Sequence, residues 1–200
     1  MEFKEIVKNR HSVRRYRAEA VPRETIDELL EMIGYSVSAI NLQPWKIKVV
    51  DDQETKETLL PATFGQTQVT GCSHLLVLCA DVDYPALIAK LDGALADAGM
   101  PNDMREGMIG FATDISNDMS PEQQLKWSQE QVYIALGNAL NGAYALGLGA
   151  CPMTAFRAAE YSRILELRET IVPTVLVSVG YPADEQPPPK LRYPVSDILV

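Results

Sequence analysis

The stretch S-P-E-Q-Q-L-K-W-S-Q-E-Q-V-Y-I-A-L-G-N-A-L-N-G-A-Y-A-L-G-L, residues 120–148, decides the fold. Its first three residues are the cap, first-turn proline and acid that are typical of a helix start. From Val132 onward the pattern is apolar nearly all round, which predicts a long helix buried in the middle of the fold. The A-C-P segment at 150–152 is expected to end this helix.

The apolar part of this helix does not have the pattern of a membrane-spanning segment. It runs for about 17 residues, short of the usual span, and contains Asn138 and Asn141. Gly137, Gly142 and Gly147 are better explained by close approach of a neighbouring element. We therefore expect a protein core around this helix, with no membrane partner.

Short helices and strands are expected on both sides of the long helix. The continuous apolar run H-L-L-V-L-C-A is typical of a strand covered on both faces. The other expected helices and strands follow from the spacing of apolar residues. Acids mark the helix starts, and prolines mark the breaks. Strands are expected at 47–50, 74–80 and 174–180, and helices at 2–9, 22–36, 54–60, 84–98 and 158–167.

The segment between residues 99 and 119 has no such pattern and is expected to be irregular. It carries methionines and Phe111 among glycine, asparagine and aspartate. Methionines commonly fill uneven gaps in a core. The alternative is an adaptable lid over a ligand.

Composition and charge limit the classes of partner. Two hundred residues with 46% hydrophobic and 22% charged side chains fit one soluble domain, expected over residues 1–200. A net charge of −9 argues against nucleic acid or an anionic membrane as the main partner. Three cysteines without a C-x-x-C motif, a charged N-terminus and no Cys/His cluster predict a cytoplasmic protein without disulfides or zinc.

The segment R-H-S-V-R-R-Y-R, residues 10–17, departs from this acidic composition. Residues 1–23 carry seven Lys/Arg against three Asp/Glu, a net of +4, whereas the remaining 177 carry 11 against 24, a net of −13. Arginine forks suit phosphates and carboxylates, so the segment indicates either a small anion site or a solvated basic loop. An extended arm, P-P-P-K-L-R at 187–192, brings two more cations.

Five separated segments, in order, resemble the FMN-dependent nitroreductase family. R-H-S-V-R is similar to the R-x-S-x-R/K signature of that family, and S-A-I-N-L-Q-P-W to its S-x-x-N-x-Q-P-W loop. W-S-Q-E-Q-V-Y-I-A-L-G-N resembles its central helix, A-L-G-L-G-A-C-P its turn beside the flavin, and P-K-L-R-Y-P its C-terminal phosphate arm. The resemblance spans residues 3–198.

The resemblance implies an α+β fold with a mixed, mainly antiparallel central sheet flanked by helices. It also implies a homodimer with FMN bound at the subunit interface and a C-terminal arm at about 182–200. The implied chemistry is ping-pong: NAD(P)H reduces FMN at N5 and leaves, and a nitroaromatic, a quinone or a related small acceptor then takes the electrons.

The resemblance also implies roles for individual residues. Phosphate binding is implied for Arg10, Ser12, Lys190 and Arg192, with His11 beside them in the motif. Arg14 is expected near the pyrimidine end of the flavin, and the backbone N–H of Ala155 near flavin N5. The other expected cofactor contacts are Ser38, Asn41, Gln43 and Pro44 from the second subunit, Gln68, and Pro152, Met153 and Thr154; substrate contacts are expected at Phe111 and Thr154.

Departures from the family pattern leave alternatives open. Many members have lysine where Gln68 stands, and close relatives with broad activity have glutamate before a glycine where this chain has Thr154 before Ala155. An FMN-binding reservoir or sensor with little turnover, and another flavin reaction such as dehalogenation or azoline oxidation, stay possible. For Cys151 a buried structural role is favoured over thiol catalysis.

Overall fold

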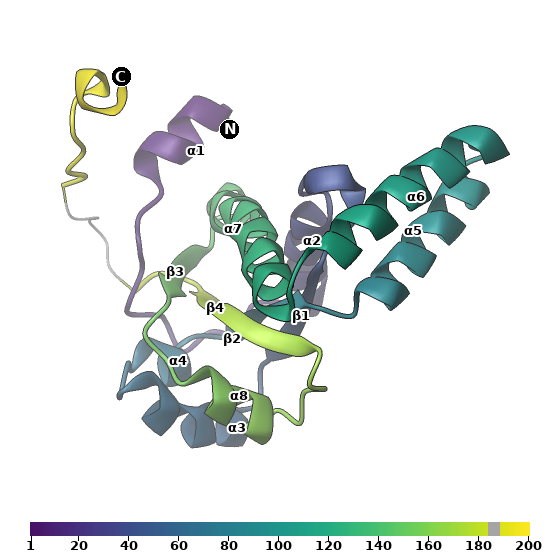
Figure 1. Ribbon diagram of the computed structural model, residues 1–200. Coiled ribbons are helices and arrows are strands. Elements are labelled where there is room, and N and C mark those ends of the chain that lie inside the picture. Colours follow the sequence, from purple (N-terminus) through teal and green to yellow (C-terminus); the bar gives the residue numbers. More distant parts are fainter. Residues whose placement is uncertain (184–188) are drawn as a thin grey trace.

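The computed structural model describes residues 1–183 and 189–200, and a four-stranded sheet lies at its centre (Figure 1). The strand order is β1-β2-β4-β3, and every neighbouring pair is antiparallel. The strands are β1 (Trp45–Val50), β2 (His74–Asp81), β3 (Gly149–Met153) and β4 (Ile171–Gly180). The expected antiparallel sheet is thus present.

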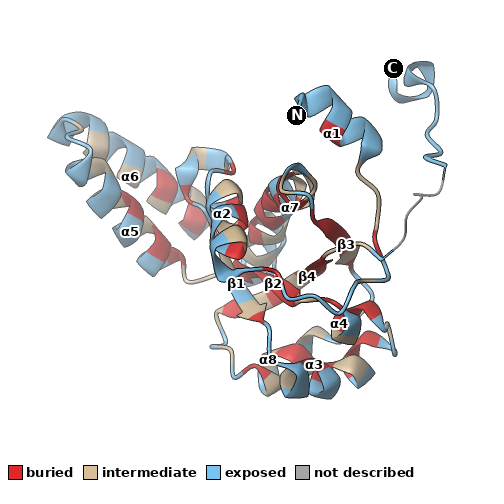
Figure 2. Ribbon diagram, turned by 180° about the vertical axis from the view of Figure 1, so that it is seen from behind, coloured by how far each residue is buried: buried red, intermediate tan, exposed pale blue. Residues whose placement is uncertain are grey.

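The central strand β2 is buried along its whole length because helices cover both faces of the sheet. Successive side chains of a strand point to opposite faces. Leu76 and Leu78 accordingly join a core cluster with α2 (Arg23–Gly34) and α7 (Pro121–Ala145), whereas Leu75 and Val77 join a second cluster with α3 (Gln53–Leu59) and α8 (Ala158–Ile164). Figure 2 shows the buried residues gathered in these layers.

The remaining helices lie at the margins of these layers. They are α1 (Phe3–Asn9), α4 (Gln68–Gly71), α5 (Tyr84–Asp97) and α6 (Asn102–Asp118), with short 3₁₀ turns at Ala39–Asn41, Leu60–Thr63 and Val195–Ile198. The α5–α6 hairpin projects from the body in Figures 1 and 2. The helices expected at 2–9, 22–36, 54–60, 84–98 and 158–167 are confirmed, with end shifts of a few residues.

The long helix α7 begins as its sequence predicts. Ser120 Oγ accepts the backbone N–H of Gln123 at 3.3 Å, and the Gln123 side chain accepts the N–H of Ser120 at 2.8 Å, a complete capping box. One face packs on the sheet and α2, but Tyr133 and Ile134 on another face are exposed in the single chain. The apolar pattern of α7 is therefore wider than the surface that this chain alone covers.

Of the three glycines in the long-helix stretch, Gly142 has the predicted packing role. A Cβ there would lie 3.0 Å from Met32 Sδ and 3.1 Å from Leu29 Cδ1, so glycine lets α2 approach. Packing within the chain does not explain Gly137, because no described atom lies within 4 Å of an added Cβ there. The packing explanation is wrong for Gly147, whose φ of +76° turns the chain after α7 ends at Ala145.

The expectation of irregular structure between residues 99 and 119 is wrong, because 102–118 form α6. Gly107 and Gly110 weaken the local helix preference, and the helix has no side-chain N-cap bond. Core filling is also wrong for Met104, which is 58% exposed, and for Met108. They share an exposed stripe of α6 with Phe111, because the three follow each other at intervals of four and three residues.

Strand β3 was not predicted, because G-A-C-P-M is short and contains Pro152. The proline is tolerated because β3 pairs with only one full strand, β4, at the edge of the sheet. The expected helix end at 150–152 is accordingly wrong, since these residues belong to β3. Strand β4 also begins at Ile171, three residues before the expected start.

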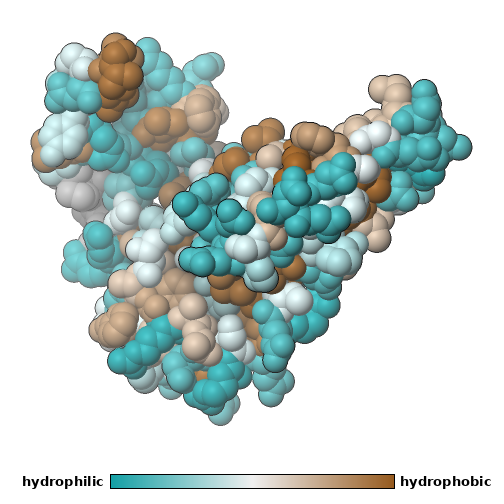
Figure 3. All heavy atoms as spheres, in the orientation of Figure 1, coloured by the Kyte–Doolittle hydropathy of each residue, from teal (hydrophilic) through white to brown (hydrophobic). Residues whose placement is uncertain are grey.

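The C-terminal segment 189–200 lies beside α1, away from the sheet (Figures 1 and 2). The expected polyproline run falls partly on Pro187 and Pro188, which lie outside the described residues. Leu191 and Tyr193 are 87% and 85% exposed. Figure 3 shows hydrophobic surface on this arm and along the upper edge of the body, with a hollow between the arm and the body.

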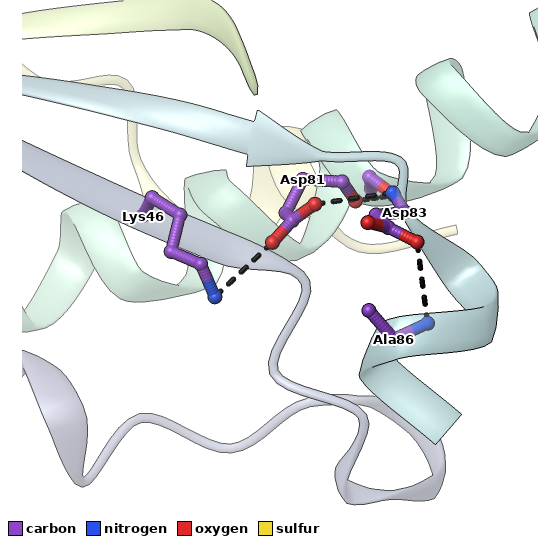
Figure 4. A network of polar contacts seen from close by, with 5 residues as sticks. Lys46, Asp81, Asp83 and Ala86 are labelled. Carbon is purple, nitrogen blue, oxygen red and sulfur yellow. Dashed lines mark hydrogen bonds and ion pairs between the residues drawn. The ribbon is translucent and has the colours of Figure 1, made fainter. Parts of the chain in front are cut away.

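A network of polar contacts fixes the base of the α5–α6 hairpin (Figure 4). The buried Asp81 carboxylate lies 3.1 Å from Lys46 Nζ on β1 and accepts the backbone N–H of Asp83 at 3.1 Å. Asp83 caps α5 by accepting the N–H of Ala86 at 3.2 Å, and Ser128 Oγ on α7 donates to the Asp81 carbonyl at 3.1 Å. Asp81 thus joins the sheet, the hairpin and α7.

Candidate cofactor site

The basic segment 10–17 is held against the edge strand β3. Ser12 forms a parallel bridge with Ala150, and the N–H of Val13 donates to the Ala150 carbonyl at 3.1 Å. A Cβ on Gly149 would lie 2.7 Å from Val13 Cγ2, so only glycine permits this approach. The segment is therefore an ordered extension of the sheet edge, and a freely solvated basic loop is the wrong description of it.

Tyr16 anchors the other end of the segment in the core. Its hydroxyl lies 2.8 Å from the Val13 carbonyl and 2.8 Å from Ser178 Oγ on β4. The ring fits because Gly180 has no side chain: a Cβ there would lie 2.9 Å from Tyr16 Cδ1. Residues 12–16 are therefore fixed at both ends, which orients the side chains between them.

Three cations from opposite ends of the chain converge beside this segment. Arg10, Lys190 and Arg192 line a cavity of about 670 Å³ whose far wall is formed by Leu140 and Asn141 of α7, with Gly137 beside them. Burial and the charge of Arg192 lower the pKa of Arg10, and burial together with Arg10 and Arg192 lowers the pKa of Lys190. These shifts indicate that the three groups repel one another.

No acid in residues 1–183 or 189–200 forms an ion pair with any of these three cations. Two exposed arginines elsewhere in the chain are paired with acids: Arg23 with Asp27 at 2.8 Å and Arg163 with Glu160 at 2.8 Å. A cluster of cations with which none of the described carboxylates pairs is stabilised by a bound anion, and a phosphate dianion would offset two of its three positive charges.

The other expected residues of the basic segment are placed as follows. His11 keeps its ring near the surface, with Nδ1 3.4 Å from the Asn9 carbonyl. Arg14 is exposed on the same edge. Burial raises the pKa of the Cys151 thiol, although Arg14 and Arg10 act in the opposite direction. Cys151 is buried and free, so its environment is that of an unreactive structural thiol.

A second group of expected residues is at the turn after β3. Thr154 and Ala155 are exposed, whereas Pro152 and Met153 belong to β3. The Ala155 N–H has no acceptor among the described residues, which leaves it available to a ligand. Its carbonyl, in contrast, accepts Gln66 Nε2 at 2.8 Å.

Gln66 is a residue that sequence reasoning missed. The sequence pointed to Gln68, but Gln68 is buried and donates its amide to Gln66 Oε1 at 3.3 Å. Gln66 in turn holds the turn at Ala155 and the Thr63 carbonyl. The F-G-Q-T-Q-V motif offered two glutamines two residues apart, and the sequence contains no signal that separates them.

The loop at 38–44 has a strained backbone that is held by hydrogen bonds within the loop. Ile40, Asn41 and Gln43 have φ values of +51°, +55° and +48°, a conformation that non-glycine residues rarely adopt. Ser38 Oγ accepts the N–H of Gln43 at 2.9 Å, and Asn41 Oδ1 accepts the Gln43 amide at 3.1 Å. Asn41 and Gln43 are exposed, whereas Pro44 is buried and its carbonyl accepts the N–H of Asp81 at 3.0 Å.

Within one chain the expected residues form two groups. Residues 10–14, the turn at 152–155 and the arm cations lie on the β3 side of the sheet, whereas the 38–44 loop leads into the opposite edge strand, β1. None of the hydrogen bonds between described residues joins the 38–44 loop to Arg10 or Arg14. Phe111 lies on the projecting hairpin, 57% exposed.

The described residues contain no group of three His, Cys, Asp or Glu side chains that could hold a metal ion. Over the same residues, no helix is both long and apolar enough to cross a membrane.

Comparisons with known proteins agree on one family. The profile of the nitroreductase family matches residues 7–181. An NADH dehydrogenase from Thermus thermophilus is 37% identical over 96% of this chain and 91% of that protein. A Bacillus subtilis protein named as an NAD(P)H nitroreductase, YfkO, is 32% identical over 86% of this chain and 83% of that protein.

Two solved structures that resemble this chain cover nearly all of it. A nitroreductase from Exiguobacterium sibiricum, determined in complex with FMN, superposes with a TM-score of 0.91 at 25% identity, covering 100% of this chain and 97% of that one. A Bacillus subtilis nitroreductase superposes with a TM-score of 0.92 at 24% identity, covering 99% and 97%.

Proposed function

The chain belongs to the nitroreductase family, and we propose on that basis that it is an NAD(P)H-dependent oxidoreductase with FMN as its cofactor. The observation that carries this proposal is the convergence of Arg10, Lys190 and Arg192 in one cavity, where none of the described acids pairs with them. The three free cysteines suit a cytoplasmic location, and we propose a single flavin-binding domain over residues 1–200.

The cations that line the cavity have the charge and the hydrogen-bond donors needed to bind the phosphate group of FMN. Arg10 and Arg192 have guanidinium groups that suit two phosphate oxygens, and Lys190 adds a third charge. When bound, FMN supplies the centre that accepts hydride from NAD(P)H and passes electrons to an acceptor.

The residues near the expected flavin ring offer two kinds of support. Arg14 places a positive charge on the same edge as Arg10, where it would stabilise negative charge on a reduced ring. The free N–H of Ala155 is held by the Gln66 bond to the carbonyl of the same residue. A donor fixed in this way would orient the hydride-accepting atom toward the nicotinamide.

The 38–44 loop supports a site shared between two copies. Asn41 and Gln43 are exposed and their backbone is strained, a combination that is common where a loop meets a ligand. A second copy would bring this loop to the basic cluster and would cover Tyr133 and Ile134.

The acceptor is a small molecule that lies against Phe111 and Thr154. The exposed stripe of Met104, Met108 and Phe111 on α6 is apolar and adaptable, which suits flat nitroaromatic or quinone acceptors. Donor and acceptor are expected to use the same position in turn, so the reaction follows ping-pong kinetics.

Initial-rate measurements test this function. Rates with NADH or NADPH against a quinone and a nitroaromatic, each at several fixed acceptor concentrations, should give parallel double-reciprocal lines. Intersecting lines would contradict the ping-pong scheme. Bound flavin with no turnover of any acceptor would instead identify an FMN reservoir or sensor.

A further inference from the structure

The cavity at the phosphate site is lined by a fourth cation that the family signature does not include. Lys8 lies in the last turn of α1 and lines the same cavity of about 670 Å³ as Arg10, Lys190 and Arg192. The described acids form no ion pair with Lys8, as with the other three. The cavity therefore holds more positive charge than the three expected cations supply.

The hydrogen bonds of Lys190 explain why a fourth cation matters. Its ammonium group donates to the carbonyl of Val7 and, at 2.9 Å, to the carbonyl of Arg10. An ammonium group has three N–H donors, so only one is left for a ligand. Lys190 thus uses most of its donors to tie the C-terminal arm to the end of α1.

The Lys8 ammonium group, unlike that of Lys190, keeps its N–H donors available for a ligand. It makes no hydrogen bond to any described residue, so all three donors are available. The bonds of Lys190 to Val7 and Arg10 fix the backbone on both sides of Lys8, which holds this turn of α1 at the wall of the cavity.

We propose that Lys8 binds the phosphate of the cofactor directly. Lys190 uses two of its three N–H donors on backbone carbonyls, so Lys8 supplies most of the ammonium hydrogen bonds to the phosphate. The proposal rests on the proposed function, because it requires a phosphorylated flavin in this cavity. Lys190 then acts mainly as the residue that positions the arm and Arg192.

Flavin titration of the apoprotein tests this role. The dissociation constants of FMN and riboflavin are measured by quenching of flavin fluorescence for the wild type, Lys8→Gln, Lys8→Arg and Lys4→Gln. Lys4 is the matched control: it is an exposed lysine of α1 one turn earlier and does not line the cavity. Circular dichroism of each variant checks that the fold is kept.

A direct phosphate contact predicts an FMN affinity about three- to tenfold weaker in Lys8→Gln, with riboflavin affinity unchanged, since only FMN has the phosphate. Lys8→Arg should retain most of the FMN affinity, and Lys4→Gln should match the wild type. Equal FMN affinity in Lys8→Gln and the wild type, or an equal loss in Lys4→Gln, overturns the role of Lys8. A wild-type protein that binds neither flavin overturns the proposed function itself.

Discussion

Arg10 and Arg192 stand 182 positions apart in the chain, and their meeting in one cavity is the strongest residue-scale support for a phosphate site. The double variant Arg10→Ala with Arg192→Ala should weaken FMN binding about 100-fold, since each charge-assisted hydrogen bond contributes roughly 1.5 kcal/mol. Equilibrium dialysis of the apoprotein with FMN measures this loss.

The matched control for that variant is Arg23→Ala with Arg163→Ala. These arginines are exposed and each pairs with an acid of its own helix, so the change in net charge is identical and the cavity is untouched. The control should bind FMN like the wild type. Unchanged affinity in the double variant at the cavity would refute the phosphate assignment.

His74 gives a residue-scale prediction about pH. Burial lowers its pKa below the ordinary 6.5, and Lys56 and Arg23 act in the same direction against Asp51. Below pH 6.5 the unfolded chain therefore binds a proton that the folded chain resists, so stability falls as pH falls. His74→Gln should flatten the fall in urea midpoint between pH 7.5 and pH 5.5; an equally steep fall in this variant would exclude His74 as a cause.

The candidate residues came from the resemblance to a family and stay predictions, and their individual geometry could not be derived from the sequence. Gln68 was expected near the flavin edge, whereas the bond of Gln66 to the Ala155 carbonyl could not be foreseen because it depends on how the fold brings the segment before α4 beside the turn after β3. The hydrogen bonds of Lys190 to two backbone carbonyls could not be predicted either, because only the fold brings those carbonyls beside its ammonium group.

At the scale of elements, Asp81 holds the base of the α5–α6 hairpin (Figure 4). Asp81→Ala removes a buried carboxylate that pairs with the partly exposed Lys46 and accepts the N–H of Asp83, so it should lower the free energy of unfolding by about 1–2 kcal/mol. Urea denaturation measures the change. Asp27→Ala breaks an exposed pair and serves as control, with an expected change below about 0.5 kcal/mol. Similar midpoints for both variants would contradict the role of Asp81.

Helices and strands with a clear sequence pattern were predictable. Those interrupted by glycine or proline were not. β2 was predicted because every residue is apolar apart from its ends, and α7 because Ser120, Pro121 and Glu122 mark a helix start before a long apolar pattern. α6 was missed because two glycines lie within its apolar spacing, and β3 because Pro152 resembles a break. Tertiary packing decided both: α6 lies along α5, and β3 pairs with β4.

At the scale of the whole molecule, the account predicts a homodimer. The arm carries Leu191 and Tyr193 almost fully exposed, and α7 exposes Tyr133 and Ile134, surfaces that a second copy would cover. Light scattering coupled to size exclusion should give twice the 22.1 kDa mass of the chain, with flavin absorbance in the same peak. A flavin-loaded monomer would contradict a site built from two chains.

The convergence of the termini could not be read from sequence alone. The basic segment and the arm each looked like a solvated, charged stretch, and only the path of the chain around α7 brings Arg10 and Lys190 together. The resemblance to a family supplied that pairing in advance, whereas composition and periodicity indicated no more than an anion site.

The visible spectrum of the purified protein under anaerobic addition of NADH and then NADPH tests the central claim most directly. We expect a yellow protein, or an apoprotein that becomes yellow with FMN, whose flavin absorbance bleaches with at least one of the two nicotinamides. A protein that takes up no FMN, or whose bound FMN stays oxidised with both donors, would contradict it.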